Sequence, residues 1–218
     1  MPISHPLQAI FVHIPKTAGT SVEAALGMHG DKTDIGIRPY YNQTPDLEHL
    51  YGGNLQHMTA ARLRIVLQDD GLFQRYFKFA VVRNPWERLV STCAWSDQKW
   101  VRGSELASTE FDRLVRELYG AFRAAKTSSR PLVLPAHLEP QVSYVLDDRR
   151  QPMLDFTARY ENLAADWERI RTRLGVNAAL PVRMRSHHRP YREYYDEETR
   201  AMVAEIYAED ARAFDYAF

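Results

Sequence analysis

Residues 8–21 read QAIFVHIPKTAGTS, and this stretch predicts the fold. Its first half, QAIFVHI, is a short and nearly continuous apolar run, which is typical of a strand buried on both faces of a sheet. The run stops at Pro15, and a turn of small residues follows. A helix is predicted to begin near Thr20 or Ser21, because both are good N-cap residues. The stretch therefore predicts a strand, a tight turn and a helix in direct succession.

The turn between this strand and this helix has the composition of an anion-binding loop. Backbone N–H groups at such a turn, together with the positive end of the helix dipole, point at a phosphate. Lys16 stands three positions before Gly19, whereas the lysine of a Walker A loop follows the last glycine. At the start of the turn, Lys16 is expected to reach the bridging oxygen between a phosphate and a transferred group. The alternative is a plain strand–helix turn with a surface lysine.

A second apolar run, FKFAVV, covers residues 77–82 and predicts a second buried strand. Arg83 ends this strand, and Ser91 lies eight residues on, in a helix predicted over 86–95. Because the carboxyl ends of parallel strands gather at one edge of a sheet, Lys16 and Arg83 are expected to face one crevice. A guanidinium and a hydroxyl together suit a phosphate monoester. The alternative is that Arg83 pairs with a carboxylate and that Ser91 is a buried helix serine.

The rest of the chain continues the alternation of strands and helices. A third strand is predicted over 154–160. Further helices are predicted over 59–69, 109–125, 139–146 and about 163–174, and a last helix opens at Asp196. Residues 27–53 show no clean period and are predicted to be irregular. Strands that alternate with helices imply a parallel sheet covered on both sides. We therefore predict an α/β fold in one domain that spans residues 1–218.

The composition excludes several classes of function. Lysine plus arginine and aspartate plus glutamate both number 28, so the formal net charge is zero. A general nucleic-acid binder needs a basic surplus to neutralise phosphates, and nucleic acid is therefore not an expected partner. The only cysteine, Cys93, excludes an intrachain disulfide and fits a reducing compartment. No stretch reaches the ~18 apolar residues needed to span a bilayer, and no signal peptide is evident. A cytoplasmic protein that does not bind membranes is predicted.

Two segments together resemble the donor motifs of a known family. IPKTAGTS (14–21) is similar to the 5′-phosphosulfate loop of the sulfotransferases that use 3′-phosphoadenosine 5′-phosphosulfate (PAPS). FKFAVVRNPWERLVS (77–91) is similar to their 3′-phosphate motif, in the form typical of the carbohydrate branch (Golgi-type, family 2) and its soluble bacterial relatives. The resemblance is colinear over most of the chain and lapses over roughly 28–55 and 96–135.

The resemblance implies a P-loop-like α/β domain around a parallel sheet. It implies that the 5′-phosphosulfate is held by the following residues: Lys16, Thr17, Ala18, Gly19, Thr20 and Ser21. Arg83 and Ser91 would hold the 3′-phosphate. The implied reaction is transfer of a sulfonate from PAPS to a hydroxyl or amine of a glycan or a small molecule such as a natural product. Adenosine 3′,5′-bisphosphate would leave, and no metal would be needed.

The transfer needs a base for the acceptor proton, and histidine is the commonest choice near neutral pH. His57 lies in the stretch where members of the family place their catalytic histidine, so it is the first candidate. Lys16 is the second expected catalytic residue, because it would stabilise charge on the departing phosphate oxygen. His13 stands inside the first strand and is predicted to be a core or near-site histidine.

A second group of residues is expected to border the acceptor cleft. His137, Glu139 and Gln141 are predicted substrate contacts, and either His137 or Glu139 is an alternative base. His187 and His188 are predicted to lie in a solvated basic loop able to close over the donor. Neither the acceptor nor the oligomeric state follows from these patterns.

Two other functions share parts of the pattern. One is a P-loop-type nucleotide-dependent kinase, which would require Mg²⁺ and turn over ATP. The position of Lys16 and the lack of a Walker B-like apolar run ending in aspartate disfavour it, and no Asp/Glu pair is placed for Mg²⁺. The other is a catalytically inactive relative that keeps the nucleotide pocket. It would bind the bisphosphate product and transfer no sulfonate.

Overall fold

Both apolar runs form strands in the computed structural model of the chain. β2 (Ala9–Val12) and β3 (Phe77–Val82) lie side by side and run parallel. The third predicted strand is β4 (Phe156–Arg159), which pairs in parallel with the other edge of β3. A short strand that the sequence did not predict, β1 (Ile3–Ser4), pairs antiparallel with β2. The sheet order is β1-β2-β3-β4, so the predicted parallel sheet forms its centre.

The structure describes the following residues: 3–28, 55–67, 69–100, 106–128, 132–183 and 188–218, with the backbone alone at 55 and 96–100. These residues form two compact units. The first unit comprises Met1–Val82 and Gln141–Met184, and the second comprises Arg83–Pro140 and Arg185–Phe218. Each unit is described by itself below. The single domain over 1–218 stays a prediction.

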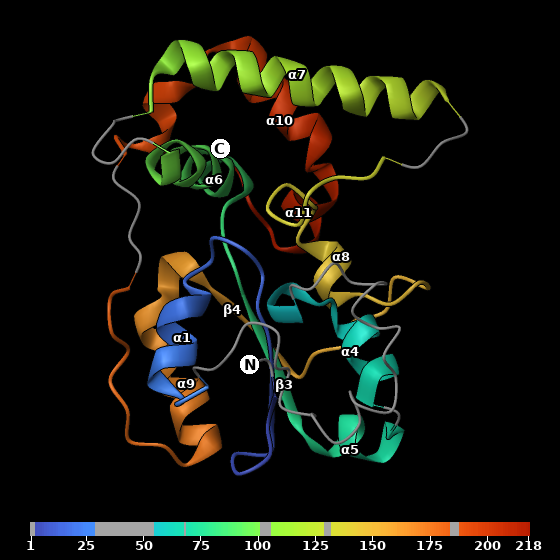
Figure 1. Cartoon of the computed structure of the whole chain (residues 1–218), viewed down its shortest axis with the longest axis vertical. Coiled ribbons are helices and arrows are strands. Elements are labelled where there is room, and N and C mark those ends of the chain that lie inside the picture. The colour runs from blue at the N-terminus through green and yellow to red at the C-terminus, as the bar shows by residue number, and fades with distance from the viewer. Residues whose placement is uncertain (1–2, 29–54, 68, 101–105, 129–131, 184–187) are drawn as a thin grey trace. The chain divides into compact units, whose positions relative to one another are not determined.

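Helices cover both faces of the sheet in the first unit (Figure 1). α1 (Gly19–Ala25) and α9 (Leu163–Leu174) lie on one face, and α4 (Ala60–Leu67) and α5 (Asp70–Arg75) lie on the other. The core under α1 and α9 is formed by large apolar side chains from the sheet and from both helices: Phe11, Val22, Phe79, Val81, Trp167 and Ile170. This arrangement confirms the predicted α/β class with a central parallel sheet flanked by helices.

Two predicted helices of this unit differ in the structure. The helix predicted over 59–69 is interrupted, because Asp69 caps a new helix by accepting a hydrogen bond from the Leu72 N–H at 2.8 Å. The helix predicted over 139–146 is a single turn, α8 (Val142–Val145). Most of the predicted irregular stretch before α4 lies outside the described residues. Among the described residues, short 3₁₀ turns occur at η1 (Leu55–His57), η2 (Tyr160–Asn162) and, in the second unit, η3 (Tyr191–Tyr194).

All the regular elements described in the second unit are helices. It contains α6 (Pro85–Trp100), α7 (Ser108–Thr127), α10 (Glu197–Ile206) and α11 (Ala208–Ala213). In Figure 1, the long α7 runs across α10. The core of the unit is formed by apolar side chains of α6, α7 and α10 and by the residue after α10: Trp86, Val90, Phe111, Val115, Val203 and Tyr207.

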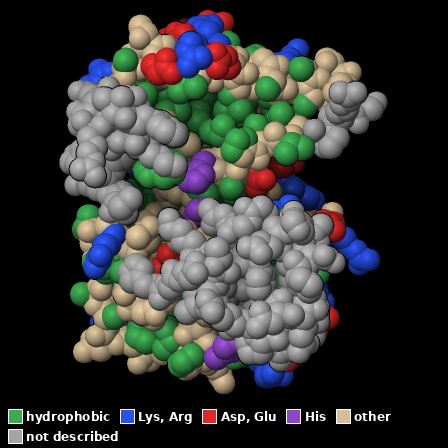
Figure 2. Space-filling view, viewed as in Figure 1, with side chains coloured by type: hydrophobic (Ala, Val, Ile, Leu, Met, Phe, Trp, Pro, Cys, Tyr) green, Lys and Arg blue, Asp and Glu red, His purple; other side chains and the backbone are tan. Residues whose placement is uncertain are grey.

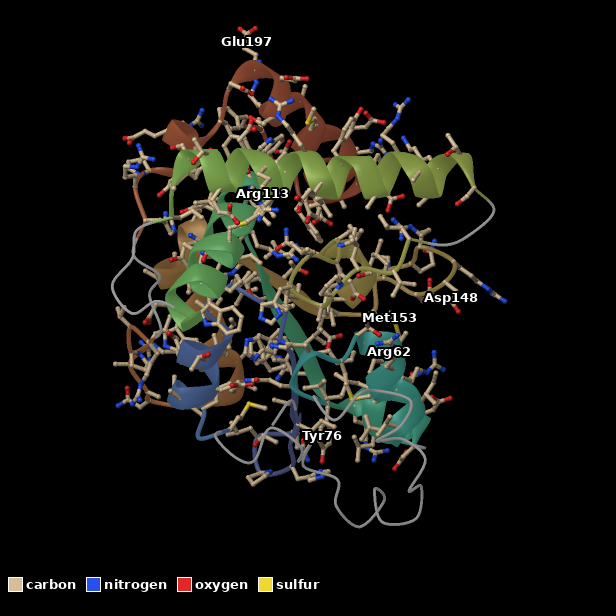
Figure 3. The ribbon with its side chains drawn as sticks, turned by 45° about the horizontal axis from the view of Figure 1, so that its top comes forward. Arg62, Tyr76, Arg113, Asp148, Met153 and Glu197 are labelled. Carbon is tan, nitrogen blue, oxygen red and sulfur yellow. The ribbon has the colours of Figure 1, made fainter. Side chains whose placement is uncertain are left out.

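Ion pairs join α7 to α10 at the surface of the second unit. Arg116 Nη1 lies 2.9 Å from Glu198 Oε2, and Lys126 Nζ lies 3.0 Å from Glu205 Oε1. Figure 2 shows basic and acidic side chains adjoining at the top of the view, where α7 lies, and Figure 3 labels Arg113 on that helix. Exposed ion pairs contribute only about 0–1 kcal/mol each. The apolar contacts described above therefore supply most of the stability of this unit.

Candidate active site

The loop that joins β2 to α1 contains two residues with left-handed backbone conformation. Residues 14–21, the loop with the first turn of α1, are called the Lys16 loop below. Lys16 has a φ of 67° and Ala18 a φ of 71°. This conformation costs a non-glycine residue of order 1–3 kcal/mol, and such strain is concentrated at functional sites. Turns of this kind gather successive backbone N–H groups on a concave side, where anions bind.

From Lys16 on, every second residue of the Lys16 loop is buried and helps to fix the loop backbone. Lys16, Ala18 and Thr20 are partly exposed, whereas Thr17, Gly19 and Ser21 are buried. The Thr17 hydroxyl donates to the Ile14 carbonyl oxygen at 2.9 Å. The Ser21 Oγ accepts from the Arg183 N–H at 3.1 Å. The buried residues therefore hold the backbone in place, and the partly exposed ones form its outer surface.

The first turn of α1 begins earlier than predicted. The helix starts at Gly19, and the left-handed Ala18 occupies the N-cap position. The predicted cap at Thr20 or Ser21 is wrong, because Ala18 already turns the chain into the helix. Among the described residues, no side chain caps this end. The first N–H groups of an α-helix have no acceptor within the helix, so this end of α1 presents backbone donors next to Lys16.

Gly19 lies directly against the ring of His13. A Cβ atom at Gly19 would stand 2.0 Å from His13 Nε2, far inside any permitted contact. The ring cannot move away easily, because it is buried and its Nδ1 lies 2.9 Å from Glu23 Oε1. Glycine is therefore required at this position by close packing, and its φ is not in the left-handed region.

Gly19→Ala is expected to lower the free energy of unfolding by ~1–3 kcal/mol, the usual cost of forcing extra volume into a packed core. Urea unfolding measures the change. Gly120→Ala is the matched control, because a Cβ there meets no atom within 4 Å. In the exposed α7 that substitution is expected to stabilise the protein by about 0.5–1 kcal/mol. Equal stability of Gly19→Ala and the wild-type protein would contradict the packing argument.

The structure fixes the orientation of the His57 ring. His57 ends η1, and its Nδ1 lies 2.9 Å from the backbone oxygen of His13. A carbonyl oxygen can only accept, so Nδ1 donates and carries the proton of the neutral ring. The Nε2 atom is then the nitrogen with the lone pair. The ring also packs edge-on against the His13 ring, with centroids 4.6 Å apart.

In the second unit, Arg83 lies two residues before α6, and Glu87 and Ser91 lie on α6, four and eight positions after Arg83. Arg83 follows the last residue of β3 in the chain, and its Nη2 donates to Glu87 Oε1 at 2.8 Å. Both Arg83 and Ser91 are buried. Arg83 thus does pair with a carboxylate and Ser91 is a buried helix serine, as the alternative interpretation predicted. Glu87 and Ser91 lie four apart on α6 and share a helix face, so the pairing with Glu87 places the Arg83 guanidinium on the side of α6 that bears Ser91.

Arg88 fastens the segment before α8 to α6 in the second unit. Its Nη2 donates to the backbone oxygens of His137 at 3.2 Å and Glu139 at 2.6 Å. The guanidinium is buried and lies opposite the carboxylate of Asp210, with 3.8 Å between Nη1 and Oδ2. The His137 ring stacks on the Trp95 ring with centroids 4.9 Å apart. The two predicted acceptor contacts, His137 and Glu139, are therefore held by one buried arginine.

The third predicted acceptor contact, Gln141, and the two histidines of the predicted basic loop remain. Gln141 belongs to the first unit and is fully buried. His188 is in the second unit, where its Nδ1 lies 2.8 Å from the backbone oxygen of Arg189. His187 lies outside the described residues.

Three further findings concern the described residues. Within the described residues, no group of three or more histidine, cysteine, aspartate or glutamate side chains is placed to hold a metal ion. Burial raises the pKa of Cys93 to about 12, so at neutral pH the side chain is a thiol. In the same parts of the chain, no helix combines the length and the apolar character needed to cross a membrane.

Comparison with known proteins assigns the chain to a family. The model of the sulfotransferase family matches residues 3–217. This chain belongs to the sulfotransferase family. The match spans both units of this sulfotransferase and confirms the resemblance predicted from the two donor motifs. Comparisons with curated proteins and with solved structures found no match.

The sulfotransferase brings its predicted residues together in two groups. The first unit holds the Lys16 loop and His57, which are linked through the backbone of His13. The second unit holds Ser91 on α6 and Arg83 just before that helix, where it pairs with Glu87. Sequence analysis missed Glu23, whose buried carboxylate joins this first group. The sequence signal for this residue was a histidine inside an apolar run, followed by an acidic residue in the next helix. A buried histidine needs a hydrogen-bond partner, and the acidic residue can supply it.

Proposed function

We propose that this sulfotransferase transfers a sulfonate from PAPS to a hydroxyl or amine of a glycan or small-molecule acceptor. The observation that carries the proposal is the Lys16 loop. It combines left-handed backbone at Lys16 and Ala18, the partly exposed side chain of Lys16, and a helix start without a side-chain cap. Backbone donors and an ammonium group in one loop suit a 5′-phosphosulfate. Thr17, Gly19, Thr20 and Ser21 contribute through the backbone that the buried members of the loop fix.

The proposed reaction is an in-line displacement at sulfur. The Nε2 atom of His57 accepts the proton of the acceptor hydroxyl, and the acceptor oxygen forms a bond to sulfur. The bond between sulfur and the bridging oxygen of the donor breaks. Lys16 and the backbone N–H groups of its loop stabilise the negative charge on the departing phosphate oxygen. The products are the sulfonated acceptor and adenosine 3′,5′-bisphosphate.

Arg83 and Ser91 are proposed to bind the 3′-phosphate of the donor. The support is the pairing of Arg83 with Glu87, which orients the guanidinium before a ligand arrives, and the place of Glu87 one helix turn before Ser91 on α6. A guanidinium fixed in this way offers its fork of donors to a phosphate. Residues 28–55 and 96–135, where the family resemblance lapses, are proposed to shape the acceptor pocket. The lone buried Cys93 fits a reducing compartment, so the proposed location is the cytoplasm.

Arg83→Ala is expected to remove most of the preference for adenosine 3′,5′-bisphosphate over 5′-AMP. A hydrogen bond to a charged group contributes ~1.5–3 kcal/mol, which is roughly 10- to 150-fold in Kd. Calorimetric titration of both nucleotides measures the preference. Arg212→Ala, which removes an exposed arginine on α11, should keep the wild-type preference. Equal affinity of the wild-type protein for the two nucleotides would show that Arg83 and Ser91 do not bind the 3′-phosphate.

A transfer assay tests the function as a whole. The protein is incubated with PAPS labelled in the sulfonate and with a panel of hydroxyl and amine acceptors, with and without a chelator. Label on an acceptor, together with release of adenosine 3′,5′-bisphosphate, supports the proposal. Mg²⁺-dependent turnover of ATP would instead identify a kinase, and tight binding of the bisphosphate without transfer to any acceptor would identify an inactive relative.

A further inference from the structure

A buried chain of hydrogen bonds lies against the Lys16 loop in the first unit. Its centre is Glu23 on α1, whose two carboxylate oxygens have different partners. Oε1 lies 2.9 Å from His13 Nδ1, and Oε2 accepts from Gln56 Nε2 at 2.8 Å. His13 is 4% exposed and Glu23 is 3% exposed. Polar groups buried this deeply persist where they are hydrogen-bonded, so the chain is a fixed part of the structure.

His13 connects this chain to His57. Gln56 and His57 are neighbours on η1, and hydrogen bonds connect each of them to His13. Gln56 reaches His13 through Glu23, and His57 donates to the backbone oxygen of His13. Two bonds on adjacent residues fix both the position of the turn and the rotation of the His57 ring. The edge-on contact between the two imidazole rings adds a third constraint.

The same His13 ring also contacts the Lys16 loop. Its Nε2 atom stands so near Gly19 that no Cβ fits between them. The ring therefore contacts both the loop that is proposed to hold the donor and the histidine that is proposed to accept the proton. A displacement of His13 would change the packing of both.

Glu23 is charged in this setting. Burial raises the pKa of Glu23, but the hydrogen bonds from His13 and Gln56 and the attraction to His13 outweigh it, and the pKa lies below its usual value. A carboxylate is acceptor-only, so it receives one donor on each oxygen. This requires His13 to donate from Nδ1 and Gln56 to present its amide nitrogen. The three side chains thus determine one another's orientation.

We propose that His13, Glu23 and Gln56 are positioning residues that set the place of the His57 imidazole relative to the Lys16 loop. The inference rests on the proposed function, in which His57 accepts the acceptor proton. None of the three is assigned a contact with the reacting atoms. A misplacement of about 1 Å in a catalytic group can cost ~10²-fold in rate. Disturbing the chain is therefore expected to lower turnover and to leave nucleotide binding unchanged.

An exchange of the amide and the carboxylate tests this role. Gln56→Glu places a second carboxylate at hydrogen-bond distance from Glu23, and like charges so close repel each other or force one group to take up a proton. The double variant Gln56→Glu/Glu23→Gln restores complementary partners. Its new amide at position 23 donates to the new carboxylate at position 56, and the amide oxygen still accepts from His13. The exchange reverses one bond and preserves the number of charges.

Two measurements follow His57 in the full chain. Imidazole ¹H–¹⁵N correlation spectra at about pH 8, above the ordinary histidine pKa of ~6.5, report which ring nitrogen carries the proton. His57→Gln assigns the signals. The wild-type protein and the double variant are expected to show the Nδ1-protonated ring, and Gln56→Glu a mixture of both forms. With PAPS and an acceptor found in the panel, Gln56→Glu should lower kcat about 10- to 100-fold at unchanged bisphosphate Kd, and the double variant should recover it.

Asp155→Asn is the control for a carboxylate outside this hydrogen-bond chain. Asp155 accepts from the Lys78 N–H, pairs with the buried Lys78 ammonium group and precedes β4 at the amino end of the strands. It should lower the melting temperature and leave the His57 spectrum and kcat unchanged. If Gln56→Glu does not fold, Gln56→Leu replaces it, because it deletes only the outer bond, with the same expected direction.

Three outcomes would overturn the positioning role. They are an unchanged His57 spectrum in the single variant, an unchanged kcat in that variant, and a double variant as impaired as the single one. Absence of transfer from PAPS to every acceptor would instead refute the proposed function. The spectra do not depend on turnover, so they still decide whether the chain positions His57.

Discussion

His57→Ala is expected to lower kcat by ~10²–10⁴-fold, the usual effect of removing a positioned general base. The affinity for adenosine 3′,5′-bisphosphate should stay unchanged, because the Lys16 loop keeps its own internal bonds. The hydrogen bond from His57 Nδ1 to the His13 carbonyl holds the proton on that nitrogen, so Nε2 is ready to accept another. Steady-state kinetics and calorimetry on the same preparations separate turnover from binding.

The pH dependence of kcat provides an independent check on His57. A base acts in its neutral form, so the wild-type rate should rise with pH through one ionisation near neutrality, and this limb should vanish in His57→Ala. A hydroxyl acceptor is used, because an amine would contribute its own ionisation. His5→Ala is the control, since His5 also uses Nδ1 for a hydrogen bond, at 2.8 Å from the Tyr76 hydroxyl. Wild-type activity in His57→Ala would direct attention to His137 or Glu139 as the base.

Lys16→Ala is expected to lower kcat by ~10²–10³-fold, the loss seen when one donor to a developing negative charge is removed. The substitution leaves the backbone conformation required at this position unchanged. Lys16 has a φ of 67°, and alanine meets the same restriction there, so the backbone strain stays nearly constant while the ammonium group is lost. The affinity for PAPS, measured without an acceptor, should fall much less than kcat, because the charge on the bridging oxygen develops only during transfer.

The comparison of kcat with Kd decides the role of Lys16. Equal losses of turnover and PAPS affinity would show that it only anchors the donor. Lys126→Ala on the exposed surface of α7 is the control and should leave both quantities unchanged. Lys16→Gly provides a second test, since glycine adopts the left-handed conformation without strain. Lys16→Gly should lower kcat as much as Lys16→Ala does. Its unfolding temperature should equal or exceed that of Lys16→Ala.

The sheet and the donor motifs could be predicted from the sequence because their signals are local. Buried parallel strands appear as apolar runs, and QAIFVHI and FKFAVV contain β2 and β3. The family match then confirms the resemblance that the two motifs indicated. The helix break at Asp69 also had a local signal, an aspartate before a further helical turn, and the prediction over 59–69 missed it by continuing the apolar period.

Other features depend on contacts that a sequence pattern does not contain. Neither lysine nor alanine indicates a left-handed residue, so the conformations of Lys16 and Ala18 could not be predicted. Gly19 was expected to serve the ligand, and the structure adds a packing reason, the ring of His13. The bond from His57 joins residues 44 positions apart, and such pairs arise from the tertiary fold alone.

A fluorescent or spin label can be attached to this protein without first removing its native cysteine. Cys93 is 7% exposed and its thiol has a pKa of about 12, so the reactive thiolate is nearly absent at neutral pH. A cysteine introduced at the exposed Arg62 of α4 would ionise near the ordinary pKa of ~8.5 and react first. Since α4 follows His57 closely in the chain, a label there can report nucleotide binding before any acceptor is known.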